Sequence, residues 1–152
     1  MAPEKKRWLI LVAGIIANLC MGTAYASSVF AAPILKLLSL TIVNPQGATV
    51  PDMTKWALAF SINLGCLPVG MLLAGPLTDR KGPRVTVAAM GALFAAGMFL
   101  AGFSGSYAWF LATFGVMMGV GSGGAYGAVV AAAVRWFPDR RGLASGLTVG
   151  AL

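Results

Sequence analysis

The chain has 152 residues, of which 59% are hydrophobic and only 10% are charged. Soluble domains carry roughly 25% charged residues, so this composition excludes an ordinary soluble domain and indicates that lipid is the main solvent of the chain. The net charge of +7 could suggest a nucleic-acid partner, but the bases are confined to short connections between apolar stretches, which excludes nucleic acid as a partner.

The first apolar stretch, Trp8 to Leu35, has 28 uncharged residues. A helix needs about 20 to cross the hydrocarbon core, so we predict a membrane-spanning helix over about 8–36. One face of this helix mixes small and polar residues and should point toward protein or water rather than lipid. Its members are Gly14, Asn18, Gly22 and Tyr25.

An alternative for the same segment is a secretory signal, because Lys5-Lys6-Arg7 precedes the apolar stretch and Ala24-Tyr25-Ala26 is similar to a cleavage site. The apolar sequence continues to Leu35, and further apolar stretches of spanning length follow. A retained spanning helix is therefore the preferred interpretation.

A connection from Leu37 to Lys55 precedes the second span and is the longest in the chain. It contains two turn-forming runs, Asn44-Pro45-Gln46-Gly47 and Val50-Pro51. Asp52 or Thr54 is a suitable N-cap for the helix that follows. The 23 uncharged residues from Trp56 to Thr78 predict that this second helix covers about 54–78.

The third apolar stretch, Val85 to Val134, has 50 uncharged residues, too many for one crossing. The polar cluster Ser104–Tyr107 divides it into two predicted helices, about 85–103 and 109–134. In the latter, glycines recur every four residues and form a face without side chains, which allows another helix to approach closely. These are Gly115, Gly119, Gly123 and Gly127.

A fifth helix is predicted to begin at about residue 141, and its apolar run reaches Leu152 without a polar tail. We therefore expect the chain to be the beginning of a longer protein. Aromatic residues at the predicted span ends are expected to anchor in the headgroup region. They are Trp8, Trp56, Tyr107, Trp109 and Trp136.

Charge sets the predicted orientation. Nine of the eleven bases precede the first span, join the second to the third or follow the fourth, which leaves +6 on that side and +1 on the other. This is the positive-inside asymmetry, and it predicts a multi-pass protein of the cytoplasmic membrane with its N-terminus in the cytoplasm.

Other motifs predict no cofactor, metal or enzymatic chemistry. Gly119-x-Gly121-x-x-Gly124 fits the dinucleotide pattern literally, but a long apolar helix precedes it where that pattern needs a strand. The chain has no histidine, and its two cysteines, Cys20 and Cys66, lie far apart inside predicted spans. Close helix packing is the preferred interpretation of these glycines, and packing also accounts for the cysteines.

The run from Gly75 to Arg84 connects the second and third predicted helices as a tight, charged turn of ten residues. It resembles the G-x-L-x-D-R-x-G-x-R loop of the major facilitator superfamily of secondary transporters. The resemblance implies that the loop gates the cytoplasmic side through contacts present in only one state. The alternative is a solvated ion cluster of little energetic weight. The gating residues so implied are Gly75, Asp79, Arg80, Gly82 and Arg84.

A second run, Arg135-Trp136-Phe137-Pro138-Asp139-Arg140-Arg141-Gly142-Leu143-Ala144-Ser145-Gly146, resembles the oxalate/formate antiporter and monocarboxylate porter branch of that superfamily. The resemblance implies that Tyr25 and Tyr126 contact the substrate carboxylate, and Asn18 and Asn63 are further candidates. Packing is the alternative for each of the four. Ala24 stands where the oxalate carrier has an amide side chain, which departs from the pattern for dicarboxylates.

The resemblance implies an all-α fold: four transmembrane helices plus the start of a fifth, the first part of a twelve-helix transporter. The expected function is alternating-access transport of a small organic anion such as lactate, formate or oxalate, with the lipid bilayer and the missing C-terminal half as partners. The apolar stretches that predict the spans contain no charged residue, so the cationic substrate-binding residue is expected outside this chain. A carrier of sugars or drugs and, if the chain is complete, a four-helix scaffold protein remain alternatives.

Overall fold

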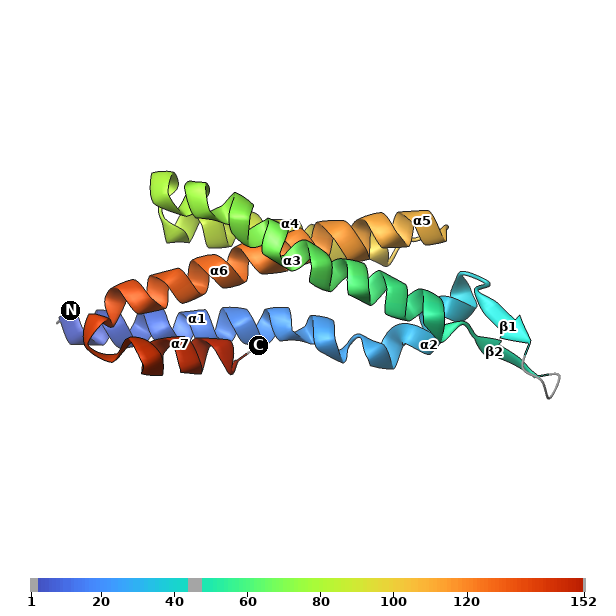
Figure 1. Cartoon of the computed structure of the whole chain (residues 1–152), viewed down its shortest axis with the longest axis horizontal. Coiled ribbons are helices and arrows are strands. Elements are labelled where there is room, and N and C mark those ends of the chain that lie inside the picture. The colour runs from blue at the N-terminus through green and yellow to red at the C-terminus, as the bar shows by residue number, and fades with distance from the viewer. Residues whose placement is uncertain (1–2, 44–47, 152) are drawn as a thin grey trace.

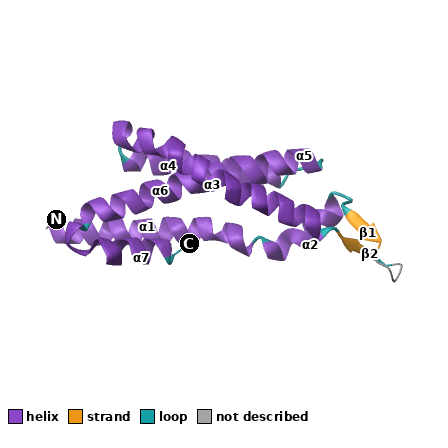
Figure 2. Cartoon of the chain, viewed as in Figure 1, coloured by secondary structure: helices purple, strands orange, loops and turns teal. Residues whose placement is uncertain are grey.

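The computed structural model of the chain describes residues 3–43 and 48–151, without the side chains of residues 3–6 and Ala24. The predicted turn Asn44–Gly47 and the side chains of Lys5 and Lys6 therefore lie outside the described residues. Helices make up most of the described chain (Figures 1 and 2). Their bounds are α1 Pro3–Ala26, α2 Ser28–Leu37, α3 Met53–Lys81, α4 Pro83–Ala101, α5 Tyr107–Phe110, η1 Leu111–Met117, α6 Met118–Trp136, η2 Pro138–Arg140 and α7 Arg141–Val149.

Four helical segments are long and apolar enough to cross a membrane: Arg7–Leu37, Met53–Lys81, Pro83–Ala101 and Tyr107–Trp136. The first combines α1 and α2, which a single residue, Ser27, separates. The last combines α5, the π-helical segment η1 and α6. Neither the interruption at Ser27 nor the π-helical segment was predicted, because hydrophobic pattern reports the length of a span and not its internal hydrogen bonding.

The connection between α3 and α4 is much shorter than the predicted ten-residue turn. Helix α3 continues to Lys81 and α4 begins at Pro83, so Gly82 alone joins them. Its φ of 85° lies in the left-handed region that glycine adopts without steric cost, and Pro83 is pre-set for the first position of the next helix. Gly75 and Asp79 thus lie in the last turns of α3.

The connection between α2 and α3 contains a small antiparallel sheet that was not predicted. Strand β1 (Thr41–Val43) pairs with β2 (Thr49–Pro51), with Ile42 opposite Val50. The β-branched residues of both strands suit the extended conformation. Asp52 then caps α3 by accepting a hydrogen bond from the Thr54 N–H at 3.1 Å, one of the two predicted N-cap residues.

Helix α6 lies between the other helices: α3 and α4 pack along one side of it, and α1 and α7 lie along the other (Figure 1). Its glycines make this possible. A Cβ atom added at Gly119 would lie 2.6 Å from the Asn63 carbonyl oxygen of α3, and one added at Gly121 would lie 2.5 Å from the Phe94 nitrogen of α4. The predicted glycine face therefore points at α3, and Gly121 and Gly124 form a second contact face toward α4.

An aromatic cluster fills the space between α3 and the start of the fourth span. The ring centroids of Trp56 lie 5.7 Å from Phe110 and 5.4 Å from Phe114, and Phe110 stacks on Phe114 at 5.0 Å. Trp56 is therefore buried in the core. Its predicted role as a headgroup anchor is wrong, because position at a span end does not reveal which side of the helix is covered. Trp8, Trp109 and Trp136 are exposed.

Candidate functional site

Three spans enclose a small concavity near the middle of the bundle. Its lining residues come from α1 (Met21, Tyr25), α3 (Phe60, Asn63, Leu67) and α6 (Ser122, Tyr126). Three of the four residues that the sequence proposed for substrate contact, Tyr25, Asn63 and Tyr126, thus lie together. The volume is about 10 Å³, far below the roughly 300–1,000 Å³ of small-molecule sites, so the concavity alone cannot enclose an organic anion.

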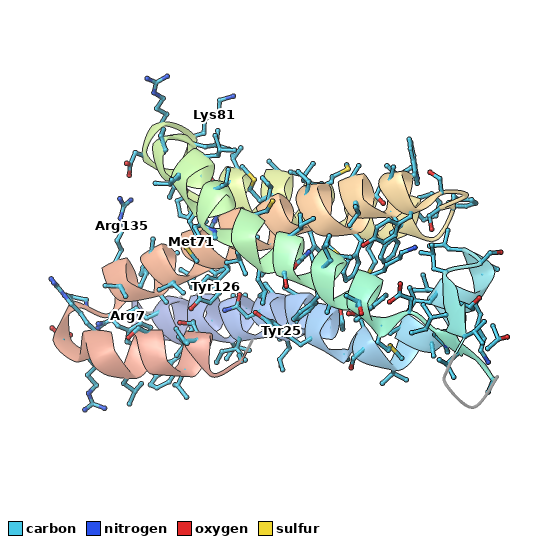
Figure 3. The ribbon with its side chains drawn as sticks, turned by 45° about the vertical axis from the view of Figure 1, so that its right-hand side comes forward. Arg7, Tyr25, Met71, Lys81, Tyr126 and Arg135 are labelled. Atoms are coloured by element: carbon cyan, nitrogen blue, oxygen red, sulfur yellow. The ribbon has the colours of Figure 1, made fainter. Side chains whose placement is uncertain are left out.

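The two tyrosines border this concavity, whose lining is almost entirely apolar. Tyr25 is partly exposed, and its ring meets Phe60 edge to face, with centroids 6.0 Å apart and an interplanar angle of 77°. Tyr126 is half-buried on α6, opposite α1 (Figure 3). Neither hydroxyl has a hydrogen-bond partner within the described part of the chain. Both can therefore donate to an anionic oxygen.

The side chains of Asn63 and Ser122, which also line the concavity, already donate hydrogen bonds to backbone carbonyl oxygens. Asn63 Nδ2 donates to the Phe114 carbonyl oxygen at 2.7 Å, inside the π-helical segment. Ser122 Oγ donates to the Gly119 carbonyl oxygen at 2.9 Å. The sequence did not single out Ser122; the only available signal was its place one helical turn before Tyr126.

Asn18 lies elsewhere. It is fully buried between α1 and α7, where its Nδ2 donates to the Thr148 carbonyl oxygen at 2.6 Å. Among the described residues its Oδ1 has no hydrogen-bond partner. The structure thus places Asn18 in a helix interface and outside the concavity. Gly14, on the same face, also points toward Thr148 and toward Val129 of α6.

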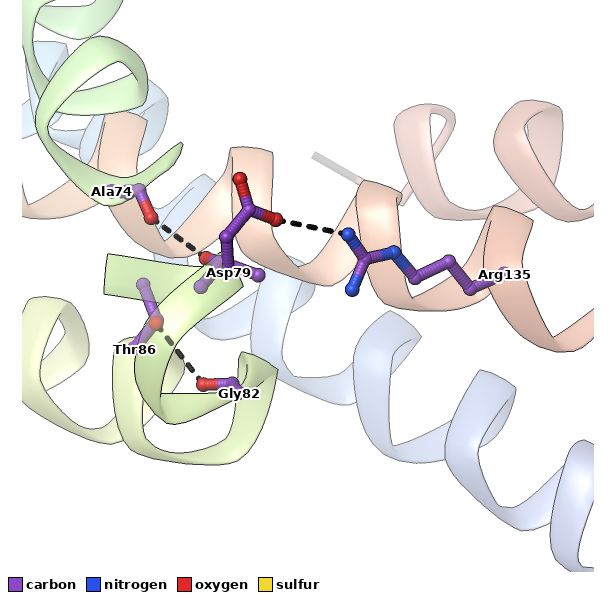
Figure 4. Close-up of polar contacts among 6 residues, drawn as sticks. Ala74, Asp79, Gly82, Thr86 and Arg135 are labelled. Atoms are coloured by element: carbon purple, nitrogen blue, oxygen red, sulfur yellow. Dashed lines mark hydrogen bonds and ion pairs between the residues drawn. The ribbon is translucent and has the colours of Figure 1, made fainter. Parts of the chain in front are cut away.

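The turns α3–α4 and α6–α7 lie at one end of the bundle, here called the cationic end, which carries Arg7, Arg80, Lys81, Arg84 and Arg135. Asp79 pairs there with Arg135 of α6 at 3.0 Å (Figure 4). Both side chains are more than 60% exposed. Arg80, Lys81 and Arg84 make no ion pair in the described ranges. The sequence named Asp79 but missed Arg135 as its partner, because 56 residues separate them.

A second ion pair at the cationic end ties α1 to the α6–α7 turn. Arg7 contacts Asp139 at 3.1 Å and donates through Nε to the Trp136 carbonyl oxygen at 2.7 Å. Its guanidinium also lies 4.9 Å from the centre of the Phe137 ring. These contacts place a positive charge at the C-terminal end of α6, where the helix dipole favours it.

The concavity is electrically neutral: no charged side chain of the described chain lines it. No group of three or more His, Cys, Asp or Glu side chains that could hold a metal ion occurs in residues 3–43 and 48–151. The concavity is therefore an uncharged, almost entirely apolar surface bordered by residues that carry neutral hydrogen-bond donors.

A family model described as the Major Facilitator Superfamily matches residues 13–152. The chain belongs to the Major Facilitator Superfamily. Its α1–α2, α3, α4 and α5–α6 segments are the four helices long and apolar enough to span a membrane in that fold, and the short helix α7 follows them. Members of the superfamily are transporters, and the resemblance of the Gly75–Arg84 run to the superfamily is confirmed.

Three curated superfamily relatives match most of the chain. An oxalate:formate antiporter of Oxalobacter formigenes is 33% identical over 144 residues, which are 93% of this chain and 31% of the relative. An uncharacterized transporter of this superfamily from Escherichia coli K12, YhjX, is 27% identical over 97% of this chain and 34% of its own length. Apicoplast pyruvate carrier 1 of Toxoplasma gondii is 28% identical, over 97% of this chain and 33% of its own length. The chain spans about a third of the length of these relatives.

Proposed function

We propose that this chain is part of a secondary transporter that moves a small organic anion across the cytoplasmic membrane by alternating access. The substrate class is a monocarboxylate such as lactate or formate, or oxalate. The observation that carries the proposal is the meeting of Tyr25, Asn63 and Tyr126, from three different spans, in one uncharged concavity. The names of two relatives, an oxalate:formate antiporter and a pyruvate carrier, support the same class.

The concavity serves as one wall of the binding site. Its volume of about 10 Å³ is too small for a substrate, so the opposite wall comes from the remainder of the transporter. The phenols of Tyr25 and Tyr126 hold the carboxylate oxygens as neutral donors. A cationic group from the remainder balances the charge, and rocking of the two halves exposes the site to each side in turn.

The gate belongs to the cationic end. Asp79, at the end of α3, pairs with Arg135 of the same half, which leaves Arg80 and Arg84 available for contacts with the other half. Contacts that exist in only one state bias the equilibrium between the two states. In this arrangement Arg135 keeps the Asp79 carboxylate in place, and Gly82 permits the tight turn that presents Arg84.

Transport by the full-length protein in proteoliposomes tests the function. We expect uptake of labelled lactate, formate or oxalate, and a KM roughly 10-fold or more higher in Tyr25→Phe and Tyr126→Phe, since a hydrogen bond to a charged group contributes about 1.5–3 kcal/mol. Tyr107→Phe is the matched control, because the Tyr107 hydroxyl donates to the Lys55 carbonyl oxygen at 2.8 Å, away from the concavity.

Two results would contradict the proposal. Absence of uptake for all three anions, with uptake of a sugar or a cationic drug instead, would overturn the substrate class. An unchanged KM in both Tyr25→Phe and Tyr126→Phe, with anion transport retained, would remove the two phenols from the site and leave anion transport intact.

A further inference from the structure

The fourth span contains a backbone carbonyl oxygen that has lost its usual helical donor. In an α-helix the Met118 N–H would bond to the carbonyl oxygen of Phe114, four residues earlier. Here it bonds to the carbonyl oxygen of Thr113, five residues earlier, because the segment Leu111–Met117 is π-helical. A buried carbonyl oxygen without a donor is unfavourable, so another group has to supply a hydrogen bond to Phe114.

The replacement donor comes from α3. Asn63 Nδ2 lies 2.7 Å from the Phe114 carbonyl oxygen, and the two residues are only 4% and 5% exposed. Helix α4 contacts the same junction through Gly97, where an added Cβ would lie 2.8 Å from the Met118 nitrogen and 3.0 Å from the Thr113 carbonyl oxygen. Two neighbouring helices therefore hold the end of the π-helical segment, α3 by an amide and α4 by close backbone contact.

The π-helical register decides how the two ends of the fourth span are turned relative to each other. Phe110 and Phe114 pack on Trp56 at one end, and Tyr126 lines the concavity beyond the other. If the same residues formed an uninterrupted α-helix, one end would be rotated by about 100° relative to the other. The aromatic packing and the placement of Tyr126 therefore both depend on the π-helical register.

We propose that Asn63 is a positioning residue: its amide holds the fourth span in the π-helical register and so keeps Tyr126 at the concavity. Asn63 then affects the solute through Tyr126 and not by direct contact, since its buried Nδ2 is committed to Phe114. The inference goes beyond the proposed function, because it follows from backbone hydrogen bonding and does not depend on which solute is carried.

A double-variant cycle on the full-length protein tests this role. Deletion of Val116 places Met118 four residues after Thr113 and Gly119 four residues after Phe114, so the Phe114 carbonyl oxygen regains a backbone donor. The Asn63 amide then has no freed carbonyl oxygen to satisfy. We expect Asn63→Leu, which keeps a similar volume, to speed amide hydrogen exchange across residues 111–118 by roughly 10-fold in the undeleted chain. Its effect in the Val116 deletion should be much smaller, and the KM for transport should follow the same pattern.

Asn18→Leu is the matched control. Asn18 is also a buried asparagine of a spanning helix, and its Nδ2 donates to a backbone carbonyl oxygen, that of Thr148 at 2.6 Å. Its partner lies in α7, outside the π-helical segment. The effect of Asn18→Leu on exchange and on KM should therefore be the same with and without Val116.

Equal effects of Asn63→Leu in the two backgrounds would overturn the role, because a residue that contacts the solute needs its amide in either register. Recovery of folded protein gives a second measurement. Rescue of a poorly recovered Asn63→Leu by the Val116 deletion supports the role, whereas loss of the double variant with recovery of the deletion alone overturns it. The exchange measurement needs no solute, so an absence of anion uptake would overturn the proposed function and leave this result unaffected.

Discussion

Gly119 shows how single glycines fix the distance between two spans. A Cβ added there would lie 2.6 Å from the Asn63 carbonyl oxygen and 3.0 Å from the Cys66 Cβ. Both neighbours belong to α3. The carbonyl oxygen of Asn63 is a backbone atom, so it cannot rotate away as a side chain could. Lipid gives helices little hydrophobic reason to associate, so close contact of this kind contributes much of the force that holds α3 to α6.

We therefore expect Gly119→Ala to destabilise the protein by about 1–3 kcal/mol through overpacking. Thermal unfolding of the purified full-length protein in detergent measures this. Gly91→Ala is the control, because a Cβ at Gly91 has no neighbour within 4 Å and alanine is the better helix former. Equal midpoints for the two variants would show that Gly119 does not set the contact.

The ion pair of Asp79 with Arg135 is a different kind of residue contact. Both side chains are mostly exposed, and such pairs contribute about 0–1 kcal/mol to stability. We predict that Asp79→Asn lowers the maximal transport rate several-fold with little change in thermal midpoint, since its effect falls on the balance between states. Asp139→Asn, which breaks the pair with Arg7, is the matched control. A loss of stability that parallels the loss of rate would contradict gating.

At the scale of the element, the fourth span is unusual because it contains seven π-helical residues, Leu111–Met117. Such segments are rare and occur often at functional sites. Here the Asn63 side chain bonds to the Phe114 carbonyl oxygen within the segment, and the aromatic rings of Phe110 and Phe114 pack on Trp56. Asn63 thus links the π-helical segment to the concavity that it also lines.

A single-residue deletion tests this element. A π-helical segment accommodates an extra residue, so deletion of Val116 should convert it toward an α-helix and keep Ser122 and Tyr126 facing α1. Deletion of Val130 in α6 should rotate part of that helix by about 100° and disrupt its packing. We expect a smaller fall in thermal midpoint and in membrane insertion for the Val116 deletion; equal losses would contradict this.

At the scale of the whole molecule, α6 is the central helix. In the most apolar part of the span that contains α6, half of the residues are buried in the structure. The corresponding share is 17% for α4 and 22% for α3. Most of the apolar surface of the other spans is therefore not covered by the described part of the chain. An apolar groove between α1, α4 and α6, of about 730 Å³, opens beside Lys81 and Arg84.

The orientation of the whole chain across the membrane can be tested by cysteine labelling. In a background without Cys20 and Cys66, cysteine at Lys81 should react with a membrane-impermeant thiol reagent only after the cells are opened, because cationic turns remain in the cytoplasm. Cysteine at Ala48, next to β2, should react in intact cells. Labelling of the Lys81 position from outside would reverse the proposed topology and place the gate on the wrong side.

The sequence by itself determined the number of spans, the charge asymmetry and the family, because each of these follows from residues that are close together in the sequence. Span length follows from an uninterrupted apolar run such as Trp56–Thr78, and the Gly75–Arg84 and Arg135–Gly146 runs are contiguous motifs. The sequence also identified Tyr25, Asn63 and Tyr126 as candidates, although it did not show that these three residues lie close together in the fold.

Only the tertiary structure decided which of those residues share a surface. Asn18 and Tyr25 lie on one predicted face of α1, yet Asn18 contacts α7 and Tyr25 borders the concavity. Three other contacts likewise join residues 50 or more positions apart in the sequence. They are the ion pair of Asp79 with Arg135, the packing of Trp56 on Phe110, and the hydrogen bond from the Asn63 amide to the Phe114 carbonyl oxygen. Contacts at such separations depend on how close the glycine faces of α6 bring the helices, and this distance is a property of packed surfaces that local sequence pattern does not encode.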